Sequence, residues 1–288
     1  MALPLDSYSF ATPATLEEAL SILGADRSAR PFAGGTDLMV LLEAGHLPPG
    51  RFVNLWGLPG LRGIHAVEDA VAIGALTTYT DLRESHVIAR QYPMLVHAAA
   101  ETGGVATQNR GTIGGNIANA SPAADTPPTL LAYDAELELQ SLSGTRRVPY
   151  HRFHTGYKKM ELAPGEIIRR ILLPRRGDGW RDHYRKVGTR RAQAISKVCL
   201  AGSIRTEEGI VREVRIAFGS VAPVVLRCAA AEKALTGLSL NPSVIADAQA
   251  ALATDIAPID DLRSTARYRL RVAQNLLAEF LNGAKTPG

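Results

Sequence analysis

The sequence is poor in cysteine, with only Cys199 and Cys228 among its 288 residues. Two thiolates cannot supply the ligands of an iron–sulfur cluster or of a four-cysteine zinc site. So few cysteines in a chain of this length also favour a reducing compartment over a disulfide scaffold. We therefore expect no metal site in this chain.

Long apolar runs are missing too, since the longest are far too short to cross a bilayer. The first six residues do not form a basic segment followed by an apolar one, so no signal peptide is expected. Together with the scarcity of cysteine, these absences predict a cytoplasmic protein without a membrane span.

Aromatic residues make up only 6% of the chain, and a net charge of +4 is carried by separate arginine pairs such as Arg146-Arg147 and Arg175-Arg176. Nucleic-acid-binding proteins usually have a denser basic stripe interleaved with aromatic residues, so no nucleic-acid partner is expected. The pairs are explained either as solvated surface arginines or as docking patches for an acidic partner.

The order of the expected strands and helices divides the chain into three parts. In the first part, a capping box at Thr15–Glu18 starts a helix, and strands at 30–33 and 51–55 flank a second helix at 38–44. This pattern predicts a β–α–β lobe. In the second part, which ends near residue 174, we expect a mixed lobe with strands at 71–75, 137–140 and 167–173 and a buried helix at 94–102.

A polar stretch at 175–179 precedes the third part. Its expected elements are strands at 184–187, 198–205 and 211–219, followed by helices at 228–235, 241–253 and 262–281. This order predicts a small antiparallel sheet packed against helices.

Two glycine pairs, Gly34-Gly35 and Gly114-Gly115, each follow an apolar residue and precede a short polar one, and both are expected at strand exits. Paired glycines permit positive φ angles and let backbone N–H groups approach an anion closely. The side chains of Thr36, Thr112 and Asn116 can add hydrogen bonds. Two such loops indicate that both bind one diphosphate group, and therefore that the ligand is a dinucleotide. Neither loop has the spacing of the usual dinucleotide or phosphate motifs, so each could also be only a tight turn.

The surrounding motifs resemble those of the FAD-binding (medium) subunit of the molybdenum hydroxylases. This family includes the medium subunit of carbon monoxide dehydrogenase and the flavin domain of xanthine dehydrogenase. The matching segments occur in the same order as in the family and cover nearly the whole chain. They are Ala33–Leu38, Ile73–Ala75, Thr112–Asp125, Gly165–Ile168 and Lys186–Val198.

This resemblance implies an α+β protein with the two-lobed FAD-binding fold of the vanillyl-alcohol-oxidase (PCMH) type. The implied domains are an FAD-binding domain at 1–174, with lobes at 1–57 and 58–174, and a CO dehydrogenase flavoprotein-like C-terminal domain at 180–288. The residues that it implies for cofactor binding are Pro31, Phe32, Ala33, Gly34, Gly35, Thr36, Asp37, Leu38, Thr102, Thr112, Ile113, Gly114, Gly115, Asn116, Asp125, Ile168 and Lys186.

Two of these residues carry charge. By the resemblance, Asp125 accepts hydrogen bonds from sugar hydroxyls, and Lys186 offsets negative charge at the pyrimidine edge of the reduced flavin. The alternatives are that Asp125 is an exposed helix cap and that Lys186 is a surface lysine on a strand.

Other positions limit the chemistry of the chain. Thr36-Asp37 stands where some relatives of this flavin fold carry a histidine bonded to FAD, and the next histidine is His46, so FAD is expected to be bound without a covalent bond. His151 and His154 have a spacing that would suit a metal, but no cluster of carboxylates or cysteines accompanies them, which favours two exposed loop histidines.

The resemblance implies a subunit that transfers electrons. A molybdenum cofactor on a large partner subunit would oxidise the substrate, and [2Fe–2S] clusters on a small partner subunit would pass the electrons to FAD, in a dimer of heterotrimers. No catalytic residue is expected in this chain, and it specifies neither the substrate nor the final acceptor. The alternatives are a self-sufficient FAD-dependent reductase or oxidase of the same fold and a non-catalytic module that has lost FAD.

Overall fold

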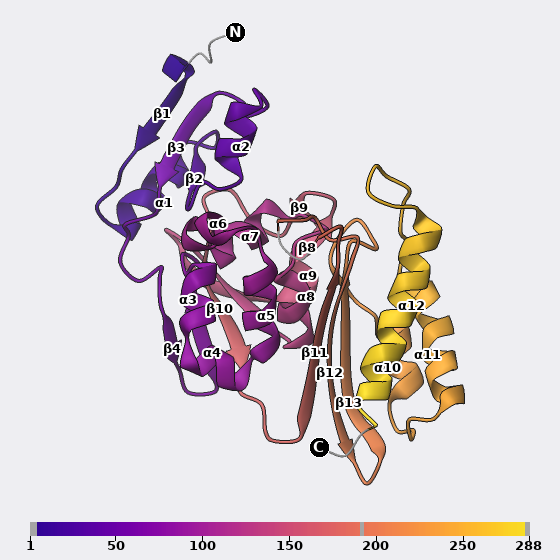
Figure 1. Ribbon diagram of the computed structural model, residues 1–288. Coiled ribbons are helices and arrows are strands. Elements are labelled where there is room, and N and C mark those ends of the chain that lie inside the picture. The colour runs from indigo at the N-terminus through magenta and orange to yellow at the C-terminus, as the bar shows by residue number, and fades with distance from the viewer. Residues whose placement is uncertain (1–4, 191–192, 286–288) are drawn as a thin grey trace.

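The structure is a computed structural model that describes residues 5–190 and 193–285. Residues 1–4, part of the segment considered above for a signal peptide, and Arg191, within the Lys186–Val198 motif, lie outside the described residues. Figure 1 shows the first lobe at one end of the molecule, the second lobe beside it, and the C-terminal sheet and helices on the opposite side. No helix in the described part of the chain is long and apolar enough to cross a membrane.

The first lobe contains the predicted β–α–β unit together with β1, a strand that was not predicted. Its three strands form a parallel sheet in the order β1-β3-β2, and the helices supply the crossovers that parallel strands need. Thr15 caps the first helix by accepting the N–H of Glu18 at 3.1 Å, whereas the Glu18 carboxylate accepts the N–H of Ala14 at 2.8 Å. The elements are η1 (Leu5–Ser7), β1 (Tyr8–Ala11), α1 (Leu16–Ala25), β2 (Arg30–Phe32), α2 (Leu38–Glu43) and β3 (Gly50–Asn54).

The second lobe is an antiparallel sheet in the order β4-β5-β10-β6-β7, with helices packed on one face. The strands are β4 (Ile64–Ala66), β5 (Ala70–Gly74), β6 (Glu136–Ser141), β7 (Gly144–Pro149) and β10 (Ile167–Pro174), and β8 (His154–Gly156) and β9 (Lys159–Met160) form a separate hairpin. The helices are α3 (Tyr79–Glu84), α4 (His86–Gln91), α5 (Pro93–Glu101), α6 (Val105–Arg110), α7 (Ile113–Asn119), α8 (Pro127–Ala132) and α9 (Tyr150–Phe153).

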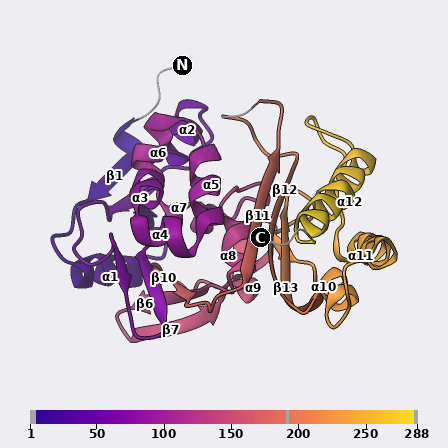
Figure 2. The same ribbon diagram turned by 60° about the horizontal axis from the view of Figure 1, so that its bottom comes forward.

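The third part is the predicted antiparallel sheet, in the order β11-β12-β13-β14, and its helices lie on one side of it (Figure 2). The last helix begins at residue 266 rather than at the predicted 262, because Thr265 caps it by accepting the N–H of Tyr268 at 3.2 Å. The elements are β11 (Trp180–Val187), β12 (Val198–Glu207), β13 (Ile210–Gly219), β14 (Leu226–Arg227), α10 (Ala229–Leu235), α11 (Pro242–Asp255) and α12 (Ala266–Gly283).

The sheet of the third part joins two cores, because successive side chains of a strand point to opposite faces. Leu200 and Ile204 of β12 belong to the core formed with α10–α12. Ala201, between them, belongs to the core of the second lobe, as does Ala217 of β13. Small residues on this face let the sheet lie close to α8, whose six residues are all buried.

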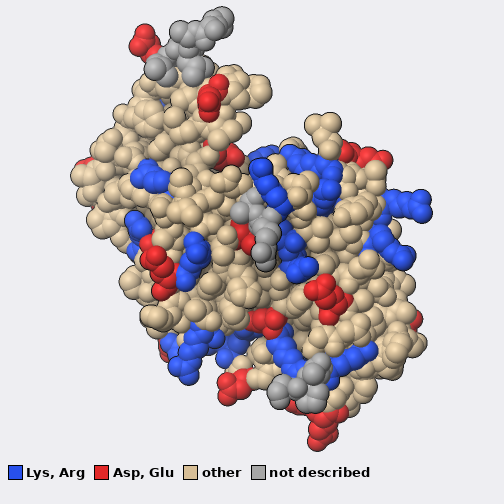
Figure 3. Space-filling model, viewed as in Figure 1, with Lys and Arg blue, Asp and Glu red and all other residues tan. Residues whose placement is uncertain are grey.

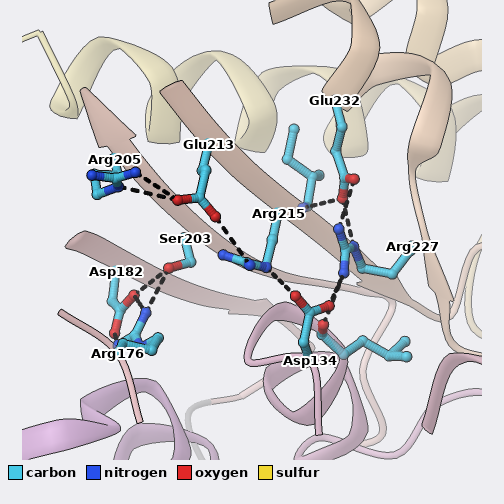
Figure 4. Close-up of polar contacts among 11 residues, drawn as sticks. Asp134, Arg176, Asp182, Ser203, Arg205, Glu213, Arg215, Arg227 and Glu232 are labelled. Carbon is cyan, nitrogen blue, oxygen red and sulfur yellow. Dashed lines mark hydrogen bonds and ion pairs between the residues drawn. The ribbon is translucent and has the colours of Figure 1, made fainter. Parts of the chain in front are cut away.

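Ion pairs reinforce this contact at its edge. Figure 4 shows the Asp134 carboxylate, which follows α8, between the guanidinium groups of Arg215 and Arg227. Glu213 and Glu232 give the same two arginines a second acceptor each. Asp134 therefore links the second lobe to two strands of the third part. Elsewhere, basic and acidic side chains are interspersed over the face drawn in Figure 3.

We expect the substitution Asp134→Ala to lower the free energy of unfolding by about 1–2 kcal/mol, because two partly buried guanidinium groups lose one of their acceptors. Chemical denaturation of the full chain measures this change. Asp178→Ala, which removes an exposed carboxylate from the 175–179 stretch, is the control. Equal stability of the two variants would show that the Asp134 ion pairs do not hold the parts together.

Candidate functional site

A pocket of about 610 Å³ lies where the two lobes meet. Its volume is within the range of small-molecule sites. Both glycine loops contribute to its wall, one from each lobe. The predicted site residues that line it are Pro31, Ala33, Gly34, Gly35, Thr36, Asp37, Leu38, Thr102, Thr112, Gly114, Gly115, Asn116 and Ile168.

Glycine is required where these loops approach their neighbours. A Cβ atom at Gly34 would lie 1.7 Å from the carbonyl oxygen of Arg110, just before the second loop. A Cβ atom at Gly114 would lie 2.5 Å from the side chain of Ala75, at the end of β5. Gly35 has a φ of +76°, which also favours glycine. The first loop can therefore touch the second lobe, and the pocket forms between them.

The two loops differ in the backbone groups that they present. In the part of the chain that the structure describes, no protein acceptor pairs with the N–H groups of residues 34–37. In the second loop, the N–H groups of Ile113 and Gly114 donate to the carbonyls of Thr77 and Ala75 at 3.0 and 2.8 Å. The first loop thus keeps consecutive N–H groups for an anion, and the second contributes mainly side chains.

The rest of the wall is largely apolar and includes residues that sequence reasoning missed. Tyr79, buried between the second loop and α8, lies on the wall, and burial raises the pKa of its hydroxyl well above the usual range. Apolar side chains from α2, from the hairpin, from β10 and from the loops that follow β3, β5 and β9 complete the wall: Leu41, Leu55, Leu76, Met160, Leu162 and Ile167. No local sequence signal marks most of them, since they come from elements that are far apart in the chain.

Four predicted site residues lie off the wall. Phe32 packs against Phe10 and Phe52 inside the first lobe, and Ile113 belongs to the core of the second lobe. Asp125 and Lys186 lie behind the wall. Lys186 Nζ donates to Asp125 Oδ2 at 2.7 Å and to the Glu101 carbonyl at 3.0 Å.

The Asp125–Lys186 pair is buried. The two alternative predictions, that Asp125 is an exposed helix cap and that Lys186 is a surface lysine, are therefore wrong. The Lys186 side chain is 3% exposed and that of Asp125 is 10% exposed. Burial raises the pKa of Asp125 to about 6, although the Lys186 ammonium acts to lower that pKa. Asp125 Oδ1 is buried without a hydrogen-bond partner among the described residues. The pair therefore keeps one acceptor atom unsatisfied.

The pair is connected to the wall at two points. Glu101, whose carbonyl accepts from Lys186, directly precedes the wall residue Thr102. Thr126, next to Asp125, donates its hydroxyl to Asn116 Oδ1 of the second loop at 2.8 Å. The pair is thus one residue away from Thr102, and its neighbour Thr126 is bonded to Asn116.

The two histidines considered above for a metal differ in their surroundings. His151 is exposed, as predicted, but His154 is half-buried with Nε2 2.9 Å from the carbonyl oxygen of Ile117, and burial lowers its pKa. Among the residues described, no three His, Cys, Asp or Glu side chains gather as a metal site would require. Cys199 and Cys228 are buried free thiols.

These features suit a dinucleotide. Unpaired N–H groups at the first loop provide donors for a diphosphate, and the apolar wall can cover flat aromatic rings. The unsatisfied Asp125 oxygen provides an acceptor for a hydroxyl group close behind the wall. The residues present therefore fit FAD.

Comparison with known proteins agrees with this geometry. Residues 6–176 match the FAD binding domain in molybdopterin dehydrogenase, and residues 183–284 match the CO dehydrogenase flavoprotein C-terminal domain. The xanthine dehydrogenase FAD-binding subunit of Escherichia coli O157:H7 is 33% identical over 284 residues, which covers 97% of this chain and 96% of that protein. The carbon monoxide dehydrogenase medium chain of Hydrogenophaga pseudoflava is 30% identical and covers 96% of each chain.

A solved structure shares the whole fold. Carbon monoxide dehydrogenase from Hydrogenophaga pseudoflava, in a form that lacks the Mo-pyranopterin moiety of its molybdenum cofactor, superimposes with a TM-score of 0.94 at 31% identity, over 99% of this chain and 98% of that one. The predicted resemblance, the α+β fold and FAD as the cofactor are confirmed. The chain belongs to the family of FAD-binding medium subunits of the molybdenum hydroxylases, which are parts of oxidoreductases.

Proposed function

We propose that this chain holds FAD as the electron carrier between the [2Fe–2S] clusters of a small partner subunit and an external acceptor. A large partner subunit with a molybdenum cofactor would oxidise the substrate, and the complex would be a dimer of heterotrimers. The observation that carries this proposal is a pocket fitted to a dinucleotide in a chain whose described residues form no cluster of metal ligands. The names of relatives as medium chains and FAD-binding subunits support it.

We assign the holding of FAD to the predicted residues in three roles. The N–H groups of residues 34–37 bind the diphosphate, with Thr112 and Asn116 adding side-chain hydrogen bonds. The apolar wall, which includes Thr102 and Ile168, excludes water from the rings. Bound FAD supplies redox chemistry that accepts and releases electrons. The wall has neither histidine nor cysteine among its described residues, which supports binding without a covalent bond.

Asp125 and Lys186 would act from behind the wall. We assign to Asp125 Oδ1 a hydrogen bond from a sugar hydroxyl of the cofactor, because that oxygen is buried without a partner among the described residues. We assign to Lys186 the stabilisation of negative charge on the reduced flavin, since a fixed buried cation favours an adjacent anion. We also propose a domain boundary in the 175–179 stretch, with the FAD-binding domain at 1–174 and the C-terminal domain at 180–288.

The first experiment tests the assembly. We expect the tagged chain, purified from its native source, to bring down two further chains together with molybdenum and iron in fixed ratio, measured by elemental analysis. The isolated chain should show no turnover with NAD(P)H and small substrates. A chain that is isolated alone and turns over a defined substrate rapidly would instead be a self-sufficient flavin enzyme.

The second experiment tests Lys186. Replacing this buried cation in Lys186→Met should lower the two-electron reduction potential of bound FAD by about 30 mV or more, equivalent to ~1.4 kcal/mol. Spectroelectrochemical titration measures the potential, and Lys233→Met, which changes an exposed lysine on α10, is the control. Unchanged FAD affinity and potential in Lys186→Met would exclude the proposed role.

The third experiment tests the burial of Asp125. A carboxylate whose folded pKa is raised stabilises the folded state below its unfolded pKa of 3.8, and that stabilisation is lost as the pH rises through 6. From pH 4 to 7, the FAD-free chain should therefore lose up to about 3 kcal/mol of unfolding free energy relative to Asp125→Asn. Denaturant titrations at each pH measure the difference. Parallel pH profiles of the two proteins would contradict it, and Asp178→Asn is the control.

A further inference from the structure

Three polar side chains on the pocket wall form a chain of hydrogen bonds. Asn119 Nδ2 donates to Asp37 Oδ1 at 3.2 Å. Lys158 Nζ donates to Asn119 Oδ1 and to the Asn119 carbonyl, both at 2.6 Å. All three residues line the pocket, and we call them the strap. Of the three, sequence analysis identified only Asp37.

The strap connects three separate elements across the division between the lobes. Asp37 stands at the end of the first glycine loop, immediately before α2. Asn119 is the last residue of α7, the helix that starts in the second glycine loop. Lys158 lies in the turn of the β8–β9 hairpin. The strap thus fastens the loop of the first lobe to two elements of the second lobe.

The backbone at one strap residue, and next to another, has a conformation that most residues avoid. Lys158 has a φ of +55°, and Ala120, which directly follows Asn119, has a φ of +49°. Residues other than glycine adopt positive φ at a cost, so such positions persist where the surroundings hold them in place. Here the conformation brings the lysine amine and the asparagine side chain to the same point of the pocket wall.

The charges of the strap also show a specific arrangement. No carboxylate lies within ion-pair distance of Lys158 among the described residues, and both of its hydrogen bonds go to Asn119. The amide of Asn119 donates on one side and accepts on the other, so it couples an anion and a cation that do not pair directly. Removal of Asn119 therefore breaks the connection between the lobes while it leaves both charges in place.

We propose that Asp37, Asn119 and Lys158 are positioning residues that hold the two lobes together over the bound dinucleotide and slow its release. This inference rests on the proposed function. A ligand between two lobes leaves when they separate, and the strap opposes that separation. Its bonds lie at the exposed edge of the pocket, so each contributes modestly. We expect the effect mainly on the dissociation rate, as is usual when a contact that holds a formed complex is removed.

The test measures the rate at which the FAD-loaded full chain loses FAD to an excess of apo-glucose oxidase, which captures free FAD. Asn119→Ala and Lys158→Met should each release FAD about three- to tenfold faster than the unchanged chain. The double variant should be no faster than the faster single variant, because both substitutions break one connection. Lys159→Met, which changes the neighbouring hairpin lysine that does not line the pocket, is the control and should leave the rate unchanged.

Other outcomes would overturn the proposal. If Lys158 instead binds a cofactor phosphate directly, only Lys158→Met will speed release, and release from the unchanged chain will accelerate strongly with salt. Unchanged rates in both variants would show that the strap has no role in release. The melting temperature of each FAD-free variant separates a local effect from unfolding, since the loss of such exposed bonds should lower it only slightly. An unchanged chain that binds no FAD would contradict the proposed function itself.

Discussion

The pocket depends on one close contact, the approach of the Gly34 loop to the carbonyl oxygen of Arg110. No side chain fits between these backbones, so glycine at this position lets the first lobe reach the second. The same approach places the unpaired N–H groups of residues 34–37 beside Thr112 and Asn116. A binding site for a long, bent ligand arises because neither lobe closes the space alone.

Among the described residues, strand β11 carries the contribution of the C-terminal part to this site. Alternate residues of β11 point toward the second lobe, so that Asp182 pairs at 2.7 Å with Arg176, just after β10, and Lys186 reaches Asp125. Figure 4 places the Asp182 pair and the Asp134 ion pairs along the same contact. The packing that joins the domains therefore also delivers a buried cation behind the pocket wall. Under the proposed function, the C-terminal part supplies through Lys186 the charge that we assign to the stabilisation of the reduced flavin.

Much of this architecture could be predicted from local signals in the sequence. Capping residues such as Thr15 and Thr265 and the glycine pairs mark element ends directly, although the apolar pattern placed the start of the last helix four residues early. The β8–β9 hairpin is too short and polar to show the alternation of apolar and polar residues that marks a strand. The partnership of Lys186 with Asp125, 61 residues apart, follows from strand pairing and domain packing, which no local pattern encodes. The half-burial of His154 likewise follows from packing between distant elements, which no local pattern encodes.

The whole arrangement is explained if FAD lies in the space between the two lobes. The visible absorption spectrum of the purified full chain, followed by acid release and identification of the flavin, tests this most directly. We expect a yellow protein that carries one noncovalent flavin per chain, released by acid as FAD. A folded, colourless chain that stays colourless after addition of FAD would contradict it, because the glycine loops would then be turns and nothing more.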